Sequence, residues 1–338
     1  MPINQQILLD NRPKEEALVS NFKMVSKKTP PLKDGEVLVQ HHFLSLDPYM
    51  RGRMNDSKSY TAAQALGEVM GGGTVGEIID SKNSKFSVGD KVVGMGGWQQ
   101  YSVVDANAPG VLRKVDTQYI PLSAYLGSVG MPGVTAWYGL MKICEPKAGQ
   151  TIAVSAASGA VGSVVGQLAK AKGCRVIGFA GGADKCKYVV DELGFDACID
   201  YKAYADSKSL YKALKEVTPD GIDGYFENVG GMILDVVLSR MNAFGRIALC
   251  GMIAGYNGAP VPITQPQLLL VNRITLRGFI VSEHMEVWPE ALKELGTMVA
   301  TGKLKFKESV AQGIASAPEA FIGLLSGKNF GKQLVKLI

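Results

Sequence analysis

The sequence is poor in the residues that usually bind metals. Its 338 residues include 5 cysteines and 3 histidines, and no two cysteines have the C-x-x-C spacing. Four nitrogen or sulfur ligands at zinc spacing cannot be assembled locally, so we expect no metal site. An odd number of cysteines, in a long chain whose first residues do not resemble a signal peptide, is typical of reduced thiols in the cytoplasm.

Blocks of like charge and uninterrupted apolar runs are also missing. The 36 lysine and arginine residues are dispersed among 31 acidic ones, so nothing predicts a nucleic-acid partner. Residues 117–141 carry no charge over a length that would suit a membrane span. Pro121, Gly127, Gly130 and Pro132 interrupt this stretch, which predicts short buried helices and no membrane partner.

The order of apolar segments predicts two domains of different type. The first third is β-rich, whereas short apolar strands alternate with amphipathic helices from residue 151 onward. Such alternation indicates an α/β fold, a doubly wound parallel sheet of the Rossmann type. We expect a β-rich domain at 1–121 and 307–338, to which the last strand returns, and a Rossmann domain at 122–306. The Rossmann strands are expected at 151–154, 175–179, 197–199, 224–226, 246–249 and 277–281, and its helices at 184–193, 210–217, 232–241 and 288–299.

A glycine turn follows the first of these strands and opens a helix. In Ser155-Ala156-Ala157-Ser158-Gly159-Ala160-Val161-Gly162, Gly159 lets the backbone approach a pyrophosphate and Gly162 allows close helix–sheet packing. The helix N-terminus offers unpaired N–H groups to the anion. Ala157 replaces the first glycine of G-x-G-x-x-G, and the alternative is a glycine pair needed only for packing.

The second strand of this domain ends without an acidic residue. NAD sites use an acid there to hold the ribose hydroxyls. Here Gly181-Gly182 follows the strand and Lys185 lies in the first turn of the next helix, where a cation suits the 2′-phosphate of NADPH. An exposed helix lysine without a ligand role is the alternative.

Several longer motifs resemble the medium-chain dehydrogenase/reductase superfamily nearly end to end. They are Ser45–Gly52 (SLDPYMRG), Pro132–Ala136 (PGVTA), Phe226–Gly231 (FENVGG), Cys250-Gly251, Tyr256-Asn257 and Asn329–Lys332 (NFGK). The closest likeness is to its zinc-independent branch of prostaglandin, leukotriene and curcumin reductases. The zinc members have a Gly-His-Glu ligand motif, whereas this chain has Leu66-Gly67-Glu68.

The resemblance implies a GroES-like catalytic domain beside the Rossmann domain, and NADPH-dependent reduction of the carbon–carbon double bond of enones without zinc. It assigns the pyrophosphate to Gly159, Ala160, Val161 and Gly162, and the 2′-phosphate to Lys185 and Tyr201. It also assigns the nicotinamide side of the cofactor to Thr135, Asn228, Cys250, Gly251, Met252, Ile253, Tyr256, Phe279, Ile280, Val281 and Asn329. Tyr49, Tyr60 and Arg51 would face the substrate.

The chemistry requires an oxygen-centred charge to be stabilised after hydride transfer. A phenol is neutral at working pH and can donate a hydrogen bond to that oxygen, and Tyr256 is our catalytic candidate. The ribose hydroxyl of the cofactor is the alternative donor. We expect Glu227 to be a hydrogen-bonding structural group rather than a catalytic acid or base.

Other functions remain open on the same scaffold, namely an NADPH quinone reductase and a non-catalytic NADPH-binding sensor. The family further implies a homodimer that joins the edge strands of two sheets, and residues 276–281 are the predicted edge.

Overall fold

The structure is a computed structural model and describes residues 1–258 and 260–338. The chain folds into two compact units, one of Met1–Gly127 and Glu308–Ile338 and the other of Ser128–Lys307. We had placed the first boundary after residue 121. The short helix η2 (Leu122–Leu126) instead belongs to the first unit, because its side chains are buried against that unit's strands and Leu126 lies against Gly73.

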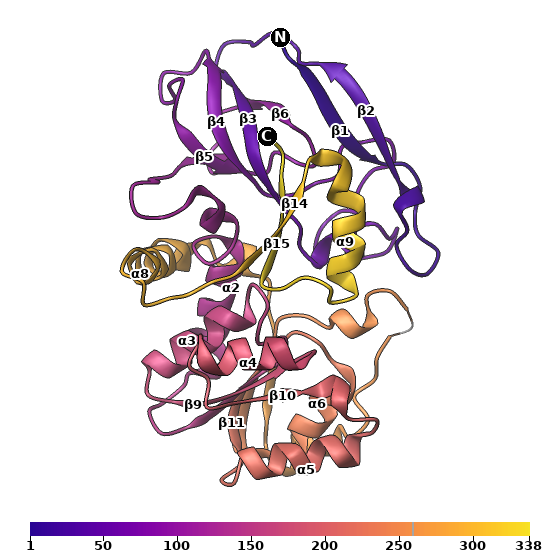
Figure 1. The fold of residues 1–338 in the computed structure, drawn as a ribbon, viewed down its shortest axis with the longest axis vertical. Coiled ribbons are helices and arrows are strands. Elements are labelled where there is room, and N and C mark those ends of the chain that lie inside the picture. The colour runs from indigo at the N-terminus through magenta and orange to yellow at the C-terminus, as the bar shows by residue number, and fades with distance from the viewer. Residues whose placement is uncertain (259) are drawn as a thin grey trace. The chain divides into compact units, whose positions relative to one another are not determined.

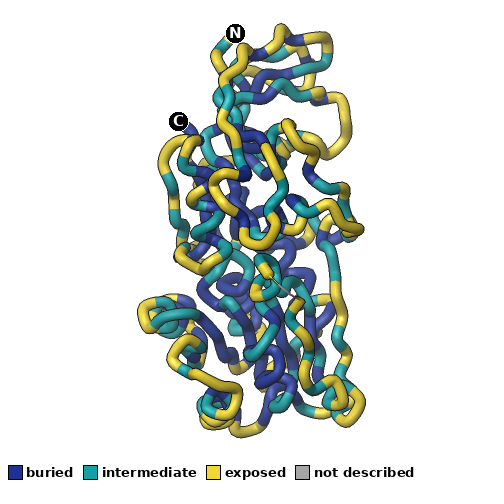
Figure 2. The backbone as a smooth tube through the Cα atoms, turned by 90° about the vertical axis from the view of Figure 1, so that its right-hand side faces the viewer, coloured by how far each residue is buried: buried dark blue, intermediate teal, exposed yellow. Residues whose placement is uncertain are grey.

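The second unit contains a six-stranded parallel sheet in the order β10-β9-β8-β11-β12-β13, as the alternating pattern predicted. Its strands are β8 (Thr151–Val154), β9 (Arg175–Ala180), β10 (Ala197–Asp200), β11 (Ile222–Glu227), β12 (Met241–Leu249) and β13 (Thr275–Gly278). The strand order reverses between β8 and β11, and ligands of such sheets bind beyond the carboxyl ends of the strands at this point. All four residues of β8 are buried, and buried backbone is drawn dark blue in Figure 2.

The connecting helices alternate with these strands along the chain (Figure 1). Asp206 caps the helix that follows β10, because its carboxylate accepts from the Ser209 amide at 2.8 Å. That helix buries only Leu210 and Leu214, one turn apart on its inner face. The helices of this unit are α2 (Met131–Tyr138), α3 (Gly162–Ala171), α4 (Ala183–Asp191), α5 (Ser207–Val217), α6 (Gly231–Leu238), α7 (Gln267–Val271) and α8 (Trp288–Ala300).

Two predicted boundaries in this unit are wrong. The last strand ends at Gly278 and not at Val281, because its partner β12 ends at Leu249 and Gly278 pairs with that residue. The helix expected to reach Met241 ends at Leu238, and Met241 pairs with Ile222 as the first residue of β12.

The first unit is built on a β sheet in the order β14-β15-β3-β4-β5-β7, with β6 also paired to β3. The last strand pairs antiparallel with β3, which confirms the predicted return of the chain. Its strands are β3 (Glu36–Ser45), β4 (Thr74–Ser81), β5 (Lys91–Gly94), β6 (Tyr101–Asp105), β7 (Leu112–Lys114), β14 (Glu308–Gln312) and β15 (Lys332–Lys336).

A hairpin and two helices of this unit give no signal in the sequence. They are β1 (Ile3–Leu9) and β2 (Phe22–Lys28), with α1 (Tyr49–Arg53) and α9 (Ala317–Leu325). Trp98 joins β2 to α9: its ring stacks on Phe22 at 5.3 Å between centroids and meets Phe321 edge-on at 5.6 Å. Aromatic contacts between segments this distant in sequence leave no local periodic signal.

Among the described residues, no helix combines the length and apolar character that crossing a bilayer requires. The uncharged run at 117–141 is divided between η2 and α2, as its glycines and prolines predicted.

Candidate active site

The turn between β8 and α3 has no room for larger residues. A Cβ added to Gly162 would lie 2.4 Å from the Ala156 carbonyl oxygen, and one added to Gly159 would lie 3.1 Å from the same atom. Ala156 itself has a φ of 49°, an unfavourable value for a residue with a Cβ. The backbone therefore turns tightly at the point where α3 begins.

Ala157 occupies the position where the dinucleotide pattern has its first glycine. Its side chain is fully buried, and its amide donates to the Phe179 carbonyl at 2.9 Å. A Cβ added to Gly178 would lie 2.8 Å from the Ala157 Cβ, so the missing glycine is compensated on the neighbouring strand.

The start of α3 presents backbone amides to an anion. Ala160, Val161 and Gly162 donate to no other backbone group within the described residues. These amides and the positive end of the ten-residue helix make a suitable site for a diphosphate.

Cationic side chains gather beyond the carboxyl ends of β9 and β10. A Cβ added to Gly181 would lie 3.1 Å from the Tyr201 hydroxyl and 2.9 Å from Lys202 Cε. Burial and then the nearby Lys202 ammonium lower the pKa of Lys185. We call Lys185, Tyr201 and Lys202 the cationic group; a phosphate dianion bound there would offset the repulsion between its two ammonium groups.

Two acidic residues are adjacent to this group in sequence: Asp184 precedes Lys185, and Asp200 precedes Tyr201. The Asp200 carboxylate is already engaged. It accepts from the Gly182 amide at 2.8 Å and from the Lys202 amide at 3.1 Å. Asp200 thus shapes the backbone around the cationic group.

Glu227 is a buried hydrogen-bonding group at the end of β11, as expected. It accepts from the Ser155 and Tyr225 hydroxyls, both at 2.7 Å, and from the Val229 amide. Burial raises the pKa of Glu227 despite these donors. Glu227 is fully buried and cannot contact a substrate, so its role is to fix the loop after β11 through the Val229 amide.

Asn228 is fixed against the glycine turn. Its amide nitrogen donates to Ser155 Oγ at 2.7 Å, and its side chain donates to the Ser155 carbonyl at 2.8 Å. The Asn228 carbonyl then accepts from Ile253 at 3.2 Å, which joins this residue to the loop after β12.

The loop from Cys250 to Tyr256 closes on itself at that point. The Tyr256 hydroxyl accepts from the Met252 amide at 3.4 Å and lies near Gly251, where an added Cβ would be 3.1 Å away. Burial beside Glu227 raises the pKa of Cys250 to about 12, which keeps that thiol neutral.

Aromatic residues pack around Phe279. Phe279 lies 5.4 Å from Tyr138 and 6.2 Å from Phe226 between ring centroids. Ile280 is half-buried and Val281 is buried. Thr135 in α2 is also buried, and its hydroxyl donates to the Met131 carbonyl at 2.7 Å.

The predicted substrate residues belong to the first unit. Burial first and then Asp47 raise the pKa of the half-buried Tyr49, and Tyr60 is near enough to contribute to the same shift. Tyr60 itself is 55% exposed. The two tyrosines are therefore brought together although ten residues of sequence lie between Tyr49 and Tyr60.

Arg51 was predicted to face the substrate, and the structure places its side chain inside the first unit. It is buried, and its guanidinium donates to the Asn55 side chain and to the Glu15 carbonyl. Asn329 forms a local turn, in which its side chain donates to the Gly331 carbonyl at 2.7 Å.

A buried ion pair joins two of the motifs that carry the resemblance. Lys332 Nζ lies 2.8 Å from Asp47 Oδ1 and 2.6 Å from the Leu46 carbonyl. This pair connects the segment before α1 to the last strand and was not foreseen from the sequence.

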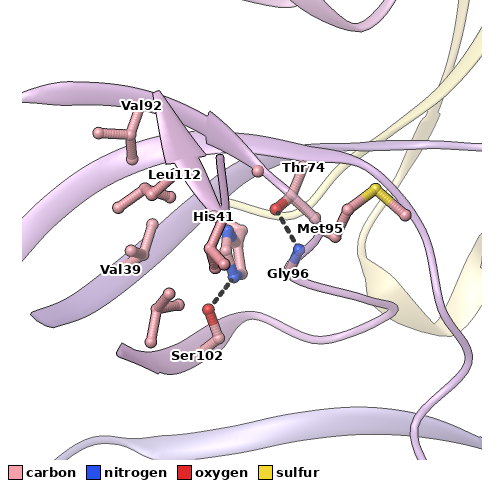
Figure 3. Close-up of a pocket in the computed structure, with 11 residues that line it drawn as sticks. Val39, His41, Thr74, Val92, Met95, Gly96, Ser102 and Leu112 are labelled. Atoms are coloured by element: carbon pink, nitrogen blue, oxygen red, sulfur yellow. Dashed lines mark hydrogen bonds between the residues drawn. The ribbon is translucent and has the colours of Figure 1, made fainter. Parts of the chain in front are cut away.

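A cavity of about 30 Å³ lies beside His41 in the first unit (Figure 3). The His41 ring bonds to the Ser102 hydroxyl at 2.8 Å through Nε2, and burial lowers its pKa to about 3. This space holds at most a water molecule and is too small for an organic substrate.

Residues 1–258 and 260–338 contain no group of three His, Cys, Asp or Glu side chains at metal-binding spacing.

Comparison with known proteins gives matches along the chain. Residues 5–112 match a family described as the N-terminal domain of oxidoreductase, and residues 160–297 match one described as zinc-binding dehydrogenase. The chain is 40% identical to the NADPH-dependent curcumin reductase of Escherichia coli, over 99% of this chain and 97% of that protein. It is 44% identical to prostaglandin reductase 1 of Rattus norvegicus, over 94% of each.

The chain belongs to the medium-chain dehydrogenase/reductase superfamily, in the branch of these reductases. The structure is similar to that of CurA from Vibrio vulnificus in complex with NADPH, with a TM-score of 0.92 and 43% sequence identity. The superposition covers 99% of each chain. The family resemblance and the α/β fold class expected from the sequence are thus confirmed.

Two residues of the candidate site were not predicted from the sequence. Lys202 directly follows Tyr201, and Ser155 precedes the glycine turn, so both lie next to residues that had been chosen. Lys202 could have been predicted, because it is a second cationic residue directly after the strand that ends at Asp200. Nothing in the sequence indicated that Ser155 bonds to Asn228.

Proposed function

We propose that the protein is an NADPH-dependent reductase of the carbon–carbon double bond of α,β-unsaturated ketones and aldehydes. The observation that carries the cofactor choice is the cationic group beyond β9 and β10, where backbone amides engage the Asp200 carboxylate. The relatives named as NADPH-dependent curcumin reductase and prostaglandin reductase support the reaction class.

Different residues of the chain bind different parts of NADPH. The amides of Ala160, Val161 and Gly162 hold the diphosphate, and the cationic group holds the 2′-phosphate. The Gly159 amide donates to the Ala156 carbonyl at 2.8 Å, so Gly159 serves the tight turn instead. Asn228, the loop from Cys250 to Tyr256, Phe279–Val281 and Thr135 line the nicotinamide end. Bound NADPH supplies the hydride for the reaction.

Tyr256 stabilises the oxygen of the substrate as negative charge develops on it. A neutral phenol can donate to that oxygen, and removal of one such donor typically costs about 10²–10³ in rate. Tyr49 and Tyr60 contact the substrate. The buried Arg51 guanidinium is engaged within its own unit by the Asn55 side chain and the Glu15 carbonyl, so Arg51 supports this part of the unit.

We also propose a cytoplasmic homodimer. The edge position of β13 supports the dimer, because an edge strand leaves backbone groups available for pairing. Replacement of Leu276 by Pro should then give a monomer in light scattering; an unchanged mass would contradict a β13 interface.

The test of function is a substrate panel assayed with NADPH and with NADH. It contains alkenals, 15-oxoprostaglandins, diarylheptanoid enones and quinones. We expect turnover of enones with a preference for NADPH, and saturated carbonyl compounds as products in mass spectrometry. Turnover of quinones alone would instead support the quinone reductase, and tight NADPH binding without any turnover would support a sensor.

A separate variant tests the assignment of Lys185 to the 2′-phosphate. Replacement of Lys185 by Ala should weaken NADPH binding and spare NADH. Equal losses for both cofactors would refute a 2′-phosphate role for Lys185.

A further inference from the structure

Two cysteines approach each other beside the cationic group. Cys186 lies in α4 and Cys198 in β10, and these two elements pack against each other. The Cys198 thiol donates a hydrogen bond to the Cys186 sulfur. Both thiols also reach the Ala180 carbonyl, which lies 3.9 Å from Cys186 Sγ.

The surroundings of the pair differ from those of the buried cysteines. Cys144 and Cys174 are buried, whereas Cys186 and Cys198 are both partly exposed. The hydrogen bond from Cys198 lowers the pKa of Cys186, and the nearby start of α4 also favours a thiolate. Cys186 is therefore the more nucleophilic sulfur, and Cys198 is the resolving one.

We propose that Cys186 and Cys198 are a reversible oxidation site, at which a hydroperoxide converts two thiols into one disulfide. The Cys186 thiolate attacks the peroxide oxygen and breaks the O–O bond, which leaves a sulfenic acid and an alcohol, or water from hydrogen peroxide. The Cys198 sulfur then attacks the sulfenic sulfur and releases water. The two thiols supply the two electrons that reduce the peroxide, and a dithiol reductant reverses the change.

The disulfide alters the site for the 2′-phosphate. An S–S bond of about 2.05 Å is much shorter than the separation of two hydrogen-bonded sulfurs, so α4 and the end of β10 must move together. Lys185 directly precedes Cys186, and Tyr201 and Lys202 directly follow β10. This consequence rests on the proposed function: the oxidised protein should bind NADPH about tenfold more weakly, with little change for NADH.

The site is tested by treating the whole protein with hydrogen peroxide in the absence of cofactor. The remaining thiols are then alkylated and peptides are mapped by mass spectrometry. We expect a cross-linked peptide containing Cys186 and Cys198 that dithiothreitol removes. The cross-link should persist in Cys174→Ser and be absent from Cys186→Ser and Cys198→Ser, whose folding is checked by thermal unfolding. If both thiols are alkylated to the same extent with and without peroxide, the proposed oxidation site is wrong. It is also wrong if peroxide converts Cys186 to a sulfinic acid and no cross-link forms.

The effect on the cofactor is measured separately by titrating NADPH and NADH onto reduced protein, oxidised protein and Lys185→Ala. A cross-link that leaves NADPH affinity unchanged, while Lys185→Ala weakens it, refutes the coupling and leaves the proposed function intact. If Lys185→Ala does not weaken NADPH binding, the phosphate assignment fails, whereas the cross-link still establishes the oxidation site.

Discussion

The Lys202 ammonium lies close enough to Lys185 to lower the pKa of that lysine, in addition to the effect of burial. Two like charges beside each other at the end of a parallel sheet oppose folding, and such arrangements are maintained where an anion binds. Asp200, the adjacent acid, directs its carboxylate to backbone amides. The relationship therefore points to phosphate recognition by both lysines.

Replacement of Lys202 by Ala should raise the NADPH KM by about 10- to 100-fold, the range for loss of a charge-assisted hydrogen bond. The NADH KM should hardly change, because NADH lacks the 2′-phosphate. Initial rates at varied cofactor concentration measure both values. Lys212→Ala, an exposed lysine of α5, is the matched control and should behave as the wild type. Equal effects of Lys202→Ala on both cofactors would remove Lys202 from the phosphate site.

Replacement of Gly162 by Ala should destabilise the second unit by about 1–3 kcal/mol, since the new Cβ would lie 2.4 Å from a carbonyl oxygen. Cofactor affinity should fall with it, because the turn that presents the amides must open. Gly323→Ala is the control: this glycine lies in α9, its added Cβ meets Lys328 at an ordinary 3.8 Å, and stability should rise slightly. Urea unfolding compares the two variants, and equal stabilities would contradict the packing argument.

Replacement of Tyr256 by Phe should lower kcat for an enone by about 10²-fold and leave the NADPH dissociation constant nearly unchanged. The phenyl ring keeps its place while the donor is lost. Steady-state kinetics and a separate cofactor titration distinguish the two quantities. Tyr119→Phe, at a 70% exposed surface position, provides the control. A fall in kcat of less than fivefold would contradict this role of Tyr256 and indicate that the cofactor ribose hydroxyl donates to the substrate oxygen.

His41 should make the stability of the first unit decrease as the pH falls. Burial lowers its pKa to about 3 in the folded protein, whereas the unfolded chain binds a proton near pH 6.5. Its contribution is present above pH 6.5 and is lost below that value, by about 2 kcal/mol at pH 5. Unfolding of the wild type and of His41→Gln from pH 5 to pH 8 measures the difference. The variant should show less of this dependence, and an NMR titration of His41 near pH 6.5 would contradict the prediction.

The amino-acid sequence by itself determined the alternating strands and helices of the second unit and the turn at Gly159 and Gly162. These features depend on neighbours within about ten residues, so hydrophobic period and backbone sterics express them directly. It also predicted that Glu227 would be structural, from its place at a strand end.

Only the tertiary structure decided which distant side chains meet. The pairing of Asp200 with Ala180 in neighbouring strands brings Lys202 near Lys185 and Cys198 to Cys186. Trp98 meets Phe22 and Phe321 through packing across the first unit. These contacts depend on the lateral register of strands and on long-range packing, and a one-dimensional pattern of apolar and polar residues does not contain that information.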